Sequence, residues 1–221
     1  MTIRLLLVDD QEMVRAGLRM VLGSRSEFDI VGEAENGVTA VDLARSMDAD
    51  VVLMDVRMPL MNGVEATAAI CESEGPRVLI LTTFDLDEYV YDALRAGASG
   101  FILKEAPIEE LVSAIVHVHR GDAVVAPSTT RRLIEHFSTN GQESSAQVEA
   151  QNCQVGMLSE REIQVLKALA QGMSNAEVAA ELFIAENTVK THVRRILTKL
   201  DLRDRVQAVV FAYNTGIVGR R

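Results

Sequence analysis

The chain contains little cysteine. Its 221 residues include two cysteines, Cys71 and Cys153, and a single pair this far apart in the chain has neither the spacing of a disulfide framework nor that of a metal-ligand motif. This excludes a disulfide-bonded scaffold and a cysteine-based metal site. It favours a reducing compartment, so we expect a cytoplasmic protein.

Long apolar runs are also missing. No stretch approaches the roughly 20 apolar residues that a membrane-spanning helix requires, so no association with a membrane is expected. The first apolar run begins almost at Met1, so no secretory signal is expected. The hydrophobic content of 48% nevertheless supports a real core, and the length suits one large domain or two modest ones.

Four short apolar runs each end at residues that can carry chemistry. The pair Asp9 and Asp10 follows LLLV, Asp55 follows VVLM, Thr82 ends VLILT, and Lys104 follows FIL. Runs of this length and composition are typical of strands buried on both faces. In an open parallel sheet, ligand chemistry gathers at the carboxyl ends of the strands. We therefore expect one crevice with three carboxylates, a hydroxyl and an ammonium, which is a site for a divalent cation and a phosphoryl group.

Strand and helix patterns alternate through the first part of the chain. The expected strands are 5–8, 30–33, 51–54, 78–81 and 101–103. The expected helices are 12–23, 37–45, 63–71, 87–95 and 107–119. This alternation predicts an α/β fold with a doubly wound, five-stranded parallel sheet.

A polar stretch separates this part from a purely helical one. Residues 138–156 have no apolar period and suit a flexible tether, and the preceding segment 128–137 can form a short helix. After Leu158, two capping-box patterns and two further amphipathic segments predict an all-α unit of four helices. The expected organisation is a domain of residues 1–122, a linker of residues 123–156 and a second domain of residues 157–221.

The net charge of −10 is distributed unevenly. Residues 1–156 contain 12 Lys and Arg against 25 Asp and Glu, whereas residues 157–221 contain 10 against 7. An acidic first part and a mildly basic second part indicate an anionic partner for the second part.

The motifs LLLVDD, VVLMDVRMPLMNG, ILTT and AGASGFILK occur in this order and resemble those of the response-regulator receiver domain, which has a flavodoxin-like fold. The resemblance covers roughly residues 1–122. It implies that Asp55 is the phosphoacceptor and that a sensor histidine kinase is the partner that supplies the phosphoryl group.

Elementary chemistry supports these roles. Three crowded carboxylates repel one another unless a divalent cation such as Mg²⁺ lies among them. Asp9, Asp10 and Asp55 would supply oxygen ligands, and the resemblance adds the backbone carbonyl of Arg57. Asp55 would act as the nucleophile and form an aspartyl phosphate.

The remaining receiver residues would bind the phosphoryl group and report its presence. Lys104 would pair with one phosphoryl oxygen, and Thr82 would donate its hydroxyl to another. Successive strand residues face opposite sides, and the spacing from Lys104 in the family pattern favours Thr82 over Thr83. Phe101 matches the aromatic residue that swings inward when this hydroxyl moves, and a plain core residue explains it equally well.

Residues 158–218 resemble the LuxR/NarL-type helix-turn-helix domain, and ENTVKTHVRRILTKL resembles its recognition helix. Apolar residues at helical spacing form one stripe of this helix, which leaves the basic residues on its outer face. The resemblance places base contacts at Lys190, Thr191 and Arg194, and candidates for phosphate contact are Thr188, Arg195 and Lys199.

The chain is accordingly identified as a member of the NarL/FixJ family of two-component response regulators. The expected function is phosphorylation-controlled binding of double-stranded promoter DNA, in which phosphorylation of Asp55 relieves inhibition or promotes a homodimer whose last helices pair. The chain is not expected to be an enzyme. Two alternatives are a phosphoester hydrolase with an aspartate nucleophile, which the helix-turn-helix pattern disfavours, and a phosphorylation-independent receiver, which the complete set of site residues disfavours.

Overall fold

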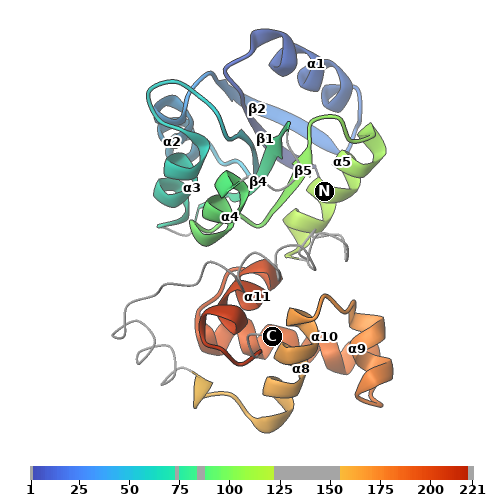
Figure 1. Ribbon diagram of the computed structural model, residues 1–221. Coiled ribbons are helices and arrows are strands. Elements are labelled where there is room, and N and C mark those ends of the chain that lie inside the picture. Colours follow the sequence, from blue (N-terminus) through green and yellow to red (C-terminus); the bar gives the residue numbers. More distant parts are fainter. Residues whose placement is uncertain (1, 73–74, 84–87, 122–154, 219–221) are drawn as a thin grey trace. The chain divides into compact units, whose positions relative to one another are not determined.

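The computed structural model describes residues 2–72, 75–83, 88–121 and 155–218 (Figure 1). The chain divides into two compact units, residues 1–124 and 125–221, and each unit is described by itself. The segment 128–137, for which a short helix was predicted, and nearly all of the predicted linker lie outside the described residues. Among the described helices, none has both the length and the apolarity needed to cross a membrane.

Five parallel strands form the sheet of the first unit in the order β2-β1-β3-β4-β5. The strands are β1 (Ile3–Val8), β2 (Phe28–Ala34), β3 (Val51–Asp55), β4 (Arg77–Thr82) and β5 (Gly100–Leu103). The three central strands are almost entirely buried, as expected for continuous apolar runs covered on both faces. The predicted five-stranded parallel sheet is confirmed.

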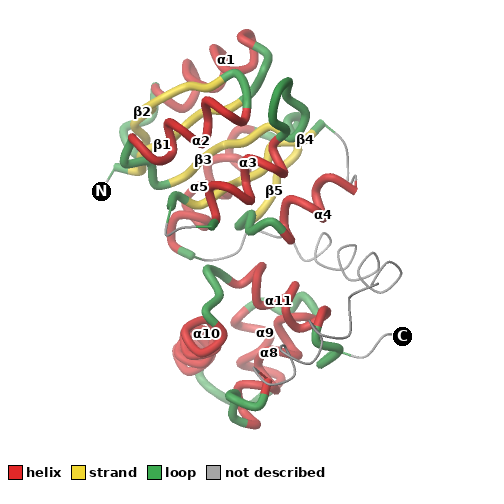
Figure 2. The backbone as a smooth tube through the Cα atoms, turned by 90° about the vertical axis from the view of Figure 1, so that its left-hand side faces the viewer, coloured by secondary structure: helices red, strands yellow, loops and turns green. Residues whose placement is uncertain are grey.

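Helices cover both faces of this sheet (Figures 1 and 2). Side chains of α1 and α5 share a core with alternate residues of the strands, whereas α2, α3 and α4 contact one another in sequence on the opposite face. The bounds are α1 (Glu12–Gly23), α2 (Gly37–Ser46), α3 (Gly63–Cys71), α4 (Glu88–Arg95) and α5 (Ile108–Arg120). The sheet is therefore doubly wound, and its strands all end at the same edge.

The described part of the second unit is helical. Its helices are α8 (Glu160–Ala170), α9 (Asn175–Glu181), α10 (Glu186–Leu200) and α11 (Arg205–Asn214). Both predicted capping boxes are present, with Ser159 before α8 and Ser174 before α9. Apolar residues from all of these helices, including Leu166, Val178 and Ile196, form one buried cluster. The predicted all-α unit is confirmed.

Candidate phosphoryl site and nucleic-acid interface

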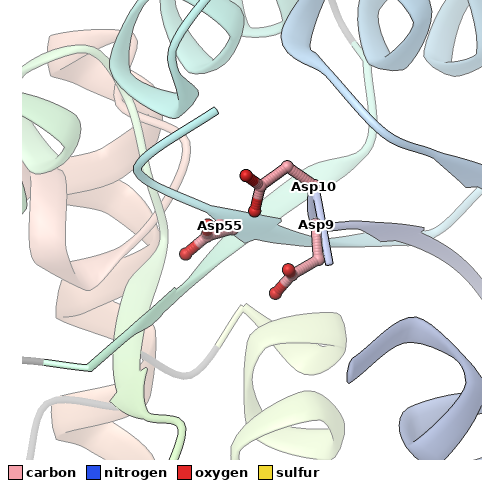
Figure 3. A group of neighbouring side chains, drawn as sticks. All are labelled: Asp9, Asp10 and Asp55. Atoms are coloured by element: carbon pink, nitrogen blue, oxygen red, sulfur yellow. The ribbon is translucent and has the colours of Figure 1, made fainter. Parts of the chain in front are cut away.

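The end of β1 brings two adjacent carboxylates to the edge of the sheet (Figure 3). Asp9 is fully buried, and its Oδ1 accepts a hydrogen bond of 2.9 Å from the backbone N–H of Gln11. Asp10 is exposed. The two neighbours therefore have different environments, one held by the protein and one open to solvent.

Asp55 is the last residue of β3 and is buried. The loop after it returns closely, because the backbone N–H of Gly63 donates a hydrogen bond of 2.9 Å to the carbonyl oxygen of Val56. A Cβ atom at Gly63 would lie 2.1 Å from the carbonyl oxygen of Asp55. Glycine is thus required where α3 begins, and this close approach fixes the backbone that carries the Asp55 carboxylate.

Lys104 follows β5 and links three strand ends. Its Nζ lies 2.6 Å from Asp9 Oδ2 and 3.0 Å from Asp55 Oδ1. Its backbone N–H donates a hydrogen bond of 2.7 Å to the carbonyl oxygen of Thr82. Residues far apart in the sequence are therefore joined at one edge of the sheet, as the sequence predicted.

The carboxylates of Asp9, Asp10 and Asp55 form an acidic cluster, in which one ligand atom from each lies within 4.8 Å of the others (Figure 3). Burial raises the pKa of Asp55 and the charge of Asp9 adds to this, while Lys104 opposes both. Burial lowers the pKa of Lys104, but its hydrogen bonds with the two carboxylates outweigh burial, so the net shift is upward. Three carboxylates around one ammonium leave a surplus of negative charge that suits a divalent cation.

A pocket of about 240 Å³ opens beside Asp55. Asp10, Lys104, Thr82 and Thr83 all line it. Thr82 is buried and Thr83 is exposed. Because both hydroxyl-bearing residues border the pocket, the role given to Thr82 stays a prediction. Arg57 and Tyr89 also line this pocket.

Phe101 lies on β5, which β4 separates from β3 and the acidic cluster. It is buried in β5 and pairs in register with Ile80 of β4. This position is compatible with a core residue and with a residue that moves when Thr82 moves, so the switch role of Phe101 stays a prediction.

Tyr89 was not predicted as a site residue. It belongs to α4, and the sequence pattern of that helix indicates only its amphipathic character. Its place beside Asp55 depends on how the N-terminal end of α4 lies against the sheet, and no local sequence signal reports this.

Helix α10, which was predicted as the recognition helix, has the predicted two faces. Val189, Ile196 and Leu200 are buried and Val193 is half-buried, which confirms the apolar stripe. The polar candidates lie on the exposed side, and they are Thr188, Lys190, Thr191, Arg194 and Arg195. An exposed face with cationic and hydroxyl groups above a buried stripe is the arrangement that fits a DNA groove.

Lys199 differs from the other candidates on α10. Its Nζ donates hydrogen bonds to Glu162 Oε2 at 2.7 Å and to the carbonyl oxygen of Met157 at 3.1 Å. Burial of Glu162 raises its pKa, but hydrogen bonds from Lys199 and Ser159 outweigh this effect and lower the pKa to about 2. Lys199 therefore ties the end of α10 to the start of α8. The capping-box pattern of Ser159 and Glu162 predicted the start of α8 but not this ion pair.

Both units match known families. Residues 5–116 match the response regulator receiver domain, and residues 156–212 match the bacterial regulatory proteins of the luxR family. The transcriptional regulatory protein LnrK of Bacillus subtilis is 40% identical over 217 residues, covering 97% of this chain and 98% of LnrK. LiaR of the same organism is 38% identical over 217 residues, covering 98% of this chain and 99% of LiaR.

A solved structure agrees with these matches. The response regulator ChrA of a heme-sensing two-component system is similar with a TM-score of 0.53 and 37% identity, covering 98% of this chain and 99% of ChrA. The chain belongs to the LuxR-type response regulators, in which a receiver domain precedes a DNA-binding domain. These two domains imply a kinase and DNA as partners, and the family consists of transcription regulators rather than classical enzymes.

Proposed function

We propose that Asp55 accepts a phosphoryl group from a histidine kinase and that this phosphorylation controls dimerisation and promoter binding. The observation that carries the proposal is the position of the Asp55 carboxylate. It is held by Lys104 Nζ at 3.0 Å and lies at a pocket that Asp10 and Thr82 also line. A nucleophile, a cation and a hydroxyl around one small pocket are the groups that phosphoryl transfer requires.

The donor set of the acidic cluster fits Mg²⁺. Both carboxylate oxygens of Asp9 already contact Gln11 or Lys104, so Asp9 would act mainly through charge and position. The exposed carboxylate of Asp10, the carboxylate of Asp55 and the backbone carbonyl of Arg57 would hold the ion. When bound, Mg²⁺ would neutralise charge on the phosphoryl oxygens.

The chain's own residues would then perform the transfer. A carboxylate oxygen of Asp55 forms a bond to phosphorus as the phosphorus–nitrogen bond of the kinase histidine breaks, and the electron pair of that bond returns to the imidazole. Lys104 pairs with one phosphoryl oxygen and Thr82 donates its hydroxyl to another. Movement of Thr82 toward the phosphoryl group leaves space that Phe101 fills. Through this change in packing, the phosphoryl group on Asp55 acts as a signal rather than as a reaction product.

The output would be read by α10 in the major groove of promoter DNA. Lys190, Thr191 and Arg194 would contact base edges, and Thr188 and Arg195 would contact phosphates. Lys199 reaches a phosphate only by giving up its pair with Glu162, which makes it the weakest candidate on this helix.

A homodimer on a two-fold site would extend the few base pairs that one recognition helix reads. On α11, Val206, Val209 and Val210 are buried in the single chain. We propose that α11 pairs between subunits and that phosphorylation of Asp55 promotes this pairing.

The experiment is a DNA-binding footprint of the full chain at a fixed salt concentration, with Mg²⁺ and with or without beryllofluoride, which imitates the phosphoryl group on Asp55. We expect beryllofluoride to lower the protein concentration needed for protection and to give a two-fold symmetric footprint. Equal protection in both conditions would contradict phosphorylation control, and a footprint of one half-site would contradict the dimer.

A further inference from the structure

A side chain of α1 holds the backbone of the acidic cluster. Nη1 of Arg15 donates a hydrogen bond of 2.7 Å to the carbonyl oxygen of Asp9. This carbonyl belongs to the peptide unit that joins Asp9 to Asp10, and a peptide unit is planar and moves as one piece. The hydrogen bond therefore restrains the peptide from which the side chain of Asp10 extends.

The position of the Asp10 carboxylate depends on this backbone. The carboxylate of Asp9 is buried and contacts the backbone N–H of Gln11 and the ammonium of Lys104, whereas Asp10 is exposed. Exposed side chains change rotamer within nanoseconds. Its peptide thus sets which positions the Asp10 carboxylate can reach within the acidic cluster.

Glu33 of β2 holds the guanidinium of Arg15. Nε of Arg15 lies 3.6 Å from Glu33 Oε2, and the Arg15 side chain is only 14% exposed. Nη1 of Arg19 donates a hydrogen bond of 2.5 Å to Glu33 Oε1, and the Arg19 side chain is 57% exposed. The two arginines share one carboxylate, and of the two it is Arg15 that bonds to the backbone of Asp9.

The charge of Arg15 and its hydrogen bond have opposite effects on a divalent cation. A guanidinium beside the acidic cluster repels Mg²⁺, so the loss of charge alone would tighten Mg²⁺ binding. Loss of the hydrogen bond would release the peptide and weaken Mg²⁺ binding, because the Asp10 carboxylate would no longer be held near its binding position. Since Glu33 pairs with the guanidinium, its net repulsion is small. The direction of the change therefore distinguishes the two effects.

We propose that Arg15 is a positioning residue that orients Asp10 for the divalent cation through the carbonyl group of Asp9, and that Glu33 holds Arg15 in place for this role. The inference rests on the proposed function, in which Asp10 is a ligand of Mg²⁺. It extends the site from the strand ends to a helix and an edge strand that supply no ligand of their own.

The test measures Mg²⁺ binding by the full, unphosphorylated chain through displacement of Mn²⁺, which prefers similar oxygen ligands. Electron paramagnetic resonance follows the free Mn²⁺. R15M keeps a long side chain and removes its hydrogen-bond donors, so it should bind Mg²⁺ about tenfold more weakly, as is typical for the loss of an outer partner of a metal ligand. R15K keeps the charge and one donor group, and should bind only about threefold more weakly than wild type.

Control variants separate Arg15 from its neighbours. R19M removes the other cation bonded to Glu33 and should bind Mg²⁺ within about twofold of wild type, the small effect typical of an exposed ion pair. E33Q should bind about threefold more weakly, and R15M/E33Q should match R15M, because Glu33 acts through Arg15. D10N alters the ligand itself and should weaken binding more than R15M does.

A second readout distinguishes positioning from a general structural role. In phosphorylation by phosphoramidate, R15M should raise the half-saturating Mg²⁺ concentration about tenfold and leave the limiting rate within about twofold of wild type. A partly unfolded variant would instead lower the limiting rate at an unchanged half-saturating concentration, and that result would overturn the positioning role.

The outcomes separate this inference from the proposed function. If wild type binds no Mg²⁺, or if D10N binds it as well as wild type does, the metal site of the proposed function fails and the role of Arg15 fails with it. If D10N loses binding but R15M binds like R19M, the role of Arg15 alone is wrong. Tighter binding by R15M would show that Arg15 acts only by its charge, and weaker binding by R15M/E33Q than by R15M would show that Glu33 does not act through Arg15.

Discussion

The phosphoryl site and the recognition helix build their chemistry in opposite ways. The phosphoryl site draws Asp9, Asp55 and Lys104 from the ends of different strands, where the two carboxylates are buried and Lys104 is half-buried. The predicted recognition helix carries Lys190, Thr191 and Arg194 within five consecutive residues and exposes them to solvent. The first site depends on the packing of the whole sheet, whereas the second needs only a stable helix with one buried face.

This difference predicts how each region responds to substitution. Under the proposed function, one change in the phosphoryl site should remove the whole function, because its residues would act together on one phosphoryl group. On α10, changes at separate exposed positions should have graded effects, because under the proposed function each side chain would make its own contact with DNA.

The largest effect is expected at Asp55. The variant D55N keeps the size of the side chain but removes the nucleophilic carboxylate, so uptake of a labelled phosphoryl group from phosphoramidate should be abolished. Circular dichroism should show an unchanged fold. Labelling of D55N at the wild-type rate would place the phosphoacceptor elsewhere and remove the basis of the comparison.

The next largest effect is expected on the exposed face of α10. R194A should weaken binding to a promoter fragment by about 10- to 100-fold, as expected for the loss of one base contact. R195A should weaken binding to all sequences alike and reduce the salt slope by about 1. K199M tests the remaining basic candidate for phosphate contact, whose ammonium is bonded to Glu162.

The salt slope decides between two roles for Lys199. If its ammonium serves only the ion pair with Glu162, K199M leaves the slope of log affinity against log salt concentration unchanged. A decrease of the K199M slope equal to that of R195A would show that Lys199 also binds a phosphate.

The close approach of Gly63 to β3 predicts that a side chain at this position lowers the stability of the receiver. G63A places a Cβ atom 2.1 Å from a backbone carbonyl oxygen, and such overpacking should lower the free energy of unfolding of the receiver by about 2–3 kcal/mol. G17A is the matched control within α1, because a Cβ at Gly17 meets nothing within 4 Å. It should stabilise the receiver by about 0.5–1 kcal/mol. Chemical denaturation of both variants measures these effects, and equal stability would disprove the steric argument.

The smallest effect is expected from Glu162, whose pKa is lowered from its ordinary value of 4.5 to about 2. A depressed carboxyl pKa contributes stability that is present above pH 4.5 and is lost as the pH falls toward 2. E162Q should therefore be less stable than wild type near neutral pH, by about 1–2 kcal/mol after allowance for the partial exposure of Lys199. The difference should shrink as the pH falls through this window. Thermal unfolding across pH tests it, and a difference that does not vary with pH would contradict the ion-pair explanation.

Several elements followed directly from local sequence patterns. Helices Glu12–Gly23, Gly63–Cys71 and Glu186–Leu200 have the predicted bounds, because their apolar spacing or capping residues mark both ends. Strand β2 was predicted over 30–33 but spans Phe28–Ala34. Its additional residues pair in register with Ile3 and Val8 of β1, so backbone pairing with a neighbouring strand extended it.

The residues of the candidate site also divide into those that the sequence predicted and those that it did not. Asp9, Asp55 and Lys104 could be predicted together, because parallel strands deliver the residues at their ends to one edge. Tyr89 could not be predicted, since its place at the pocket depends on the packing of α4. Nor could the ion pair between Glu162 and Lys199, which joins two helices across the second unit.

By itself, the sequence determined the strands and helices, the two-domain organisation expected of the family, and the chemical groups available for phosphoryl transfer and DNA binding. These follow from periodicity, capping and motif order, which are local properties of the chain. Only the tertiary structure decided that Lys104 bridges Asp9 and Asp55, that Lys199 is held by Glu162, and that Arg57 stacks on Tyr89. These contacts join residues distant in sequence, and their geometry arises from how whole elements pack.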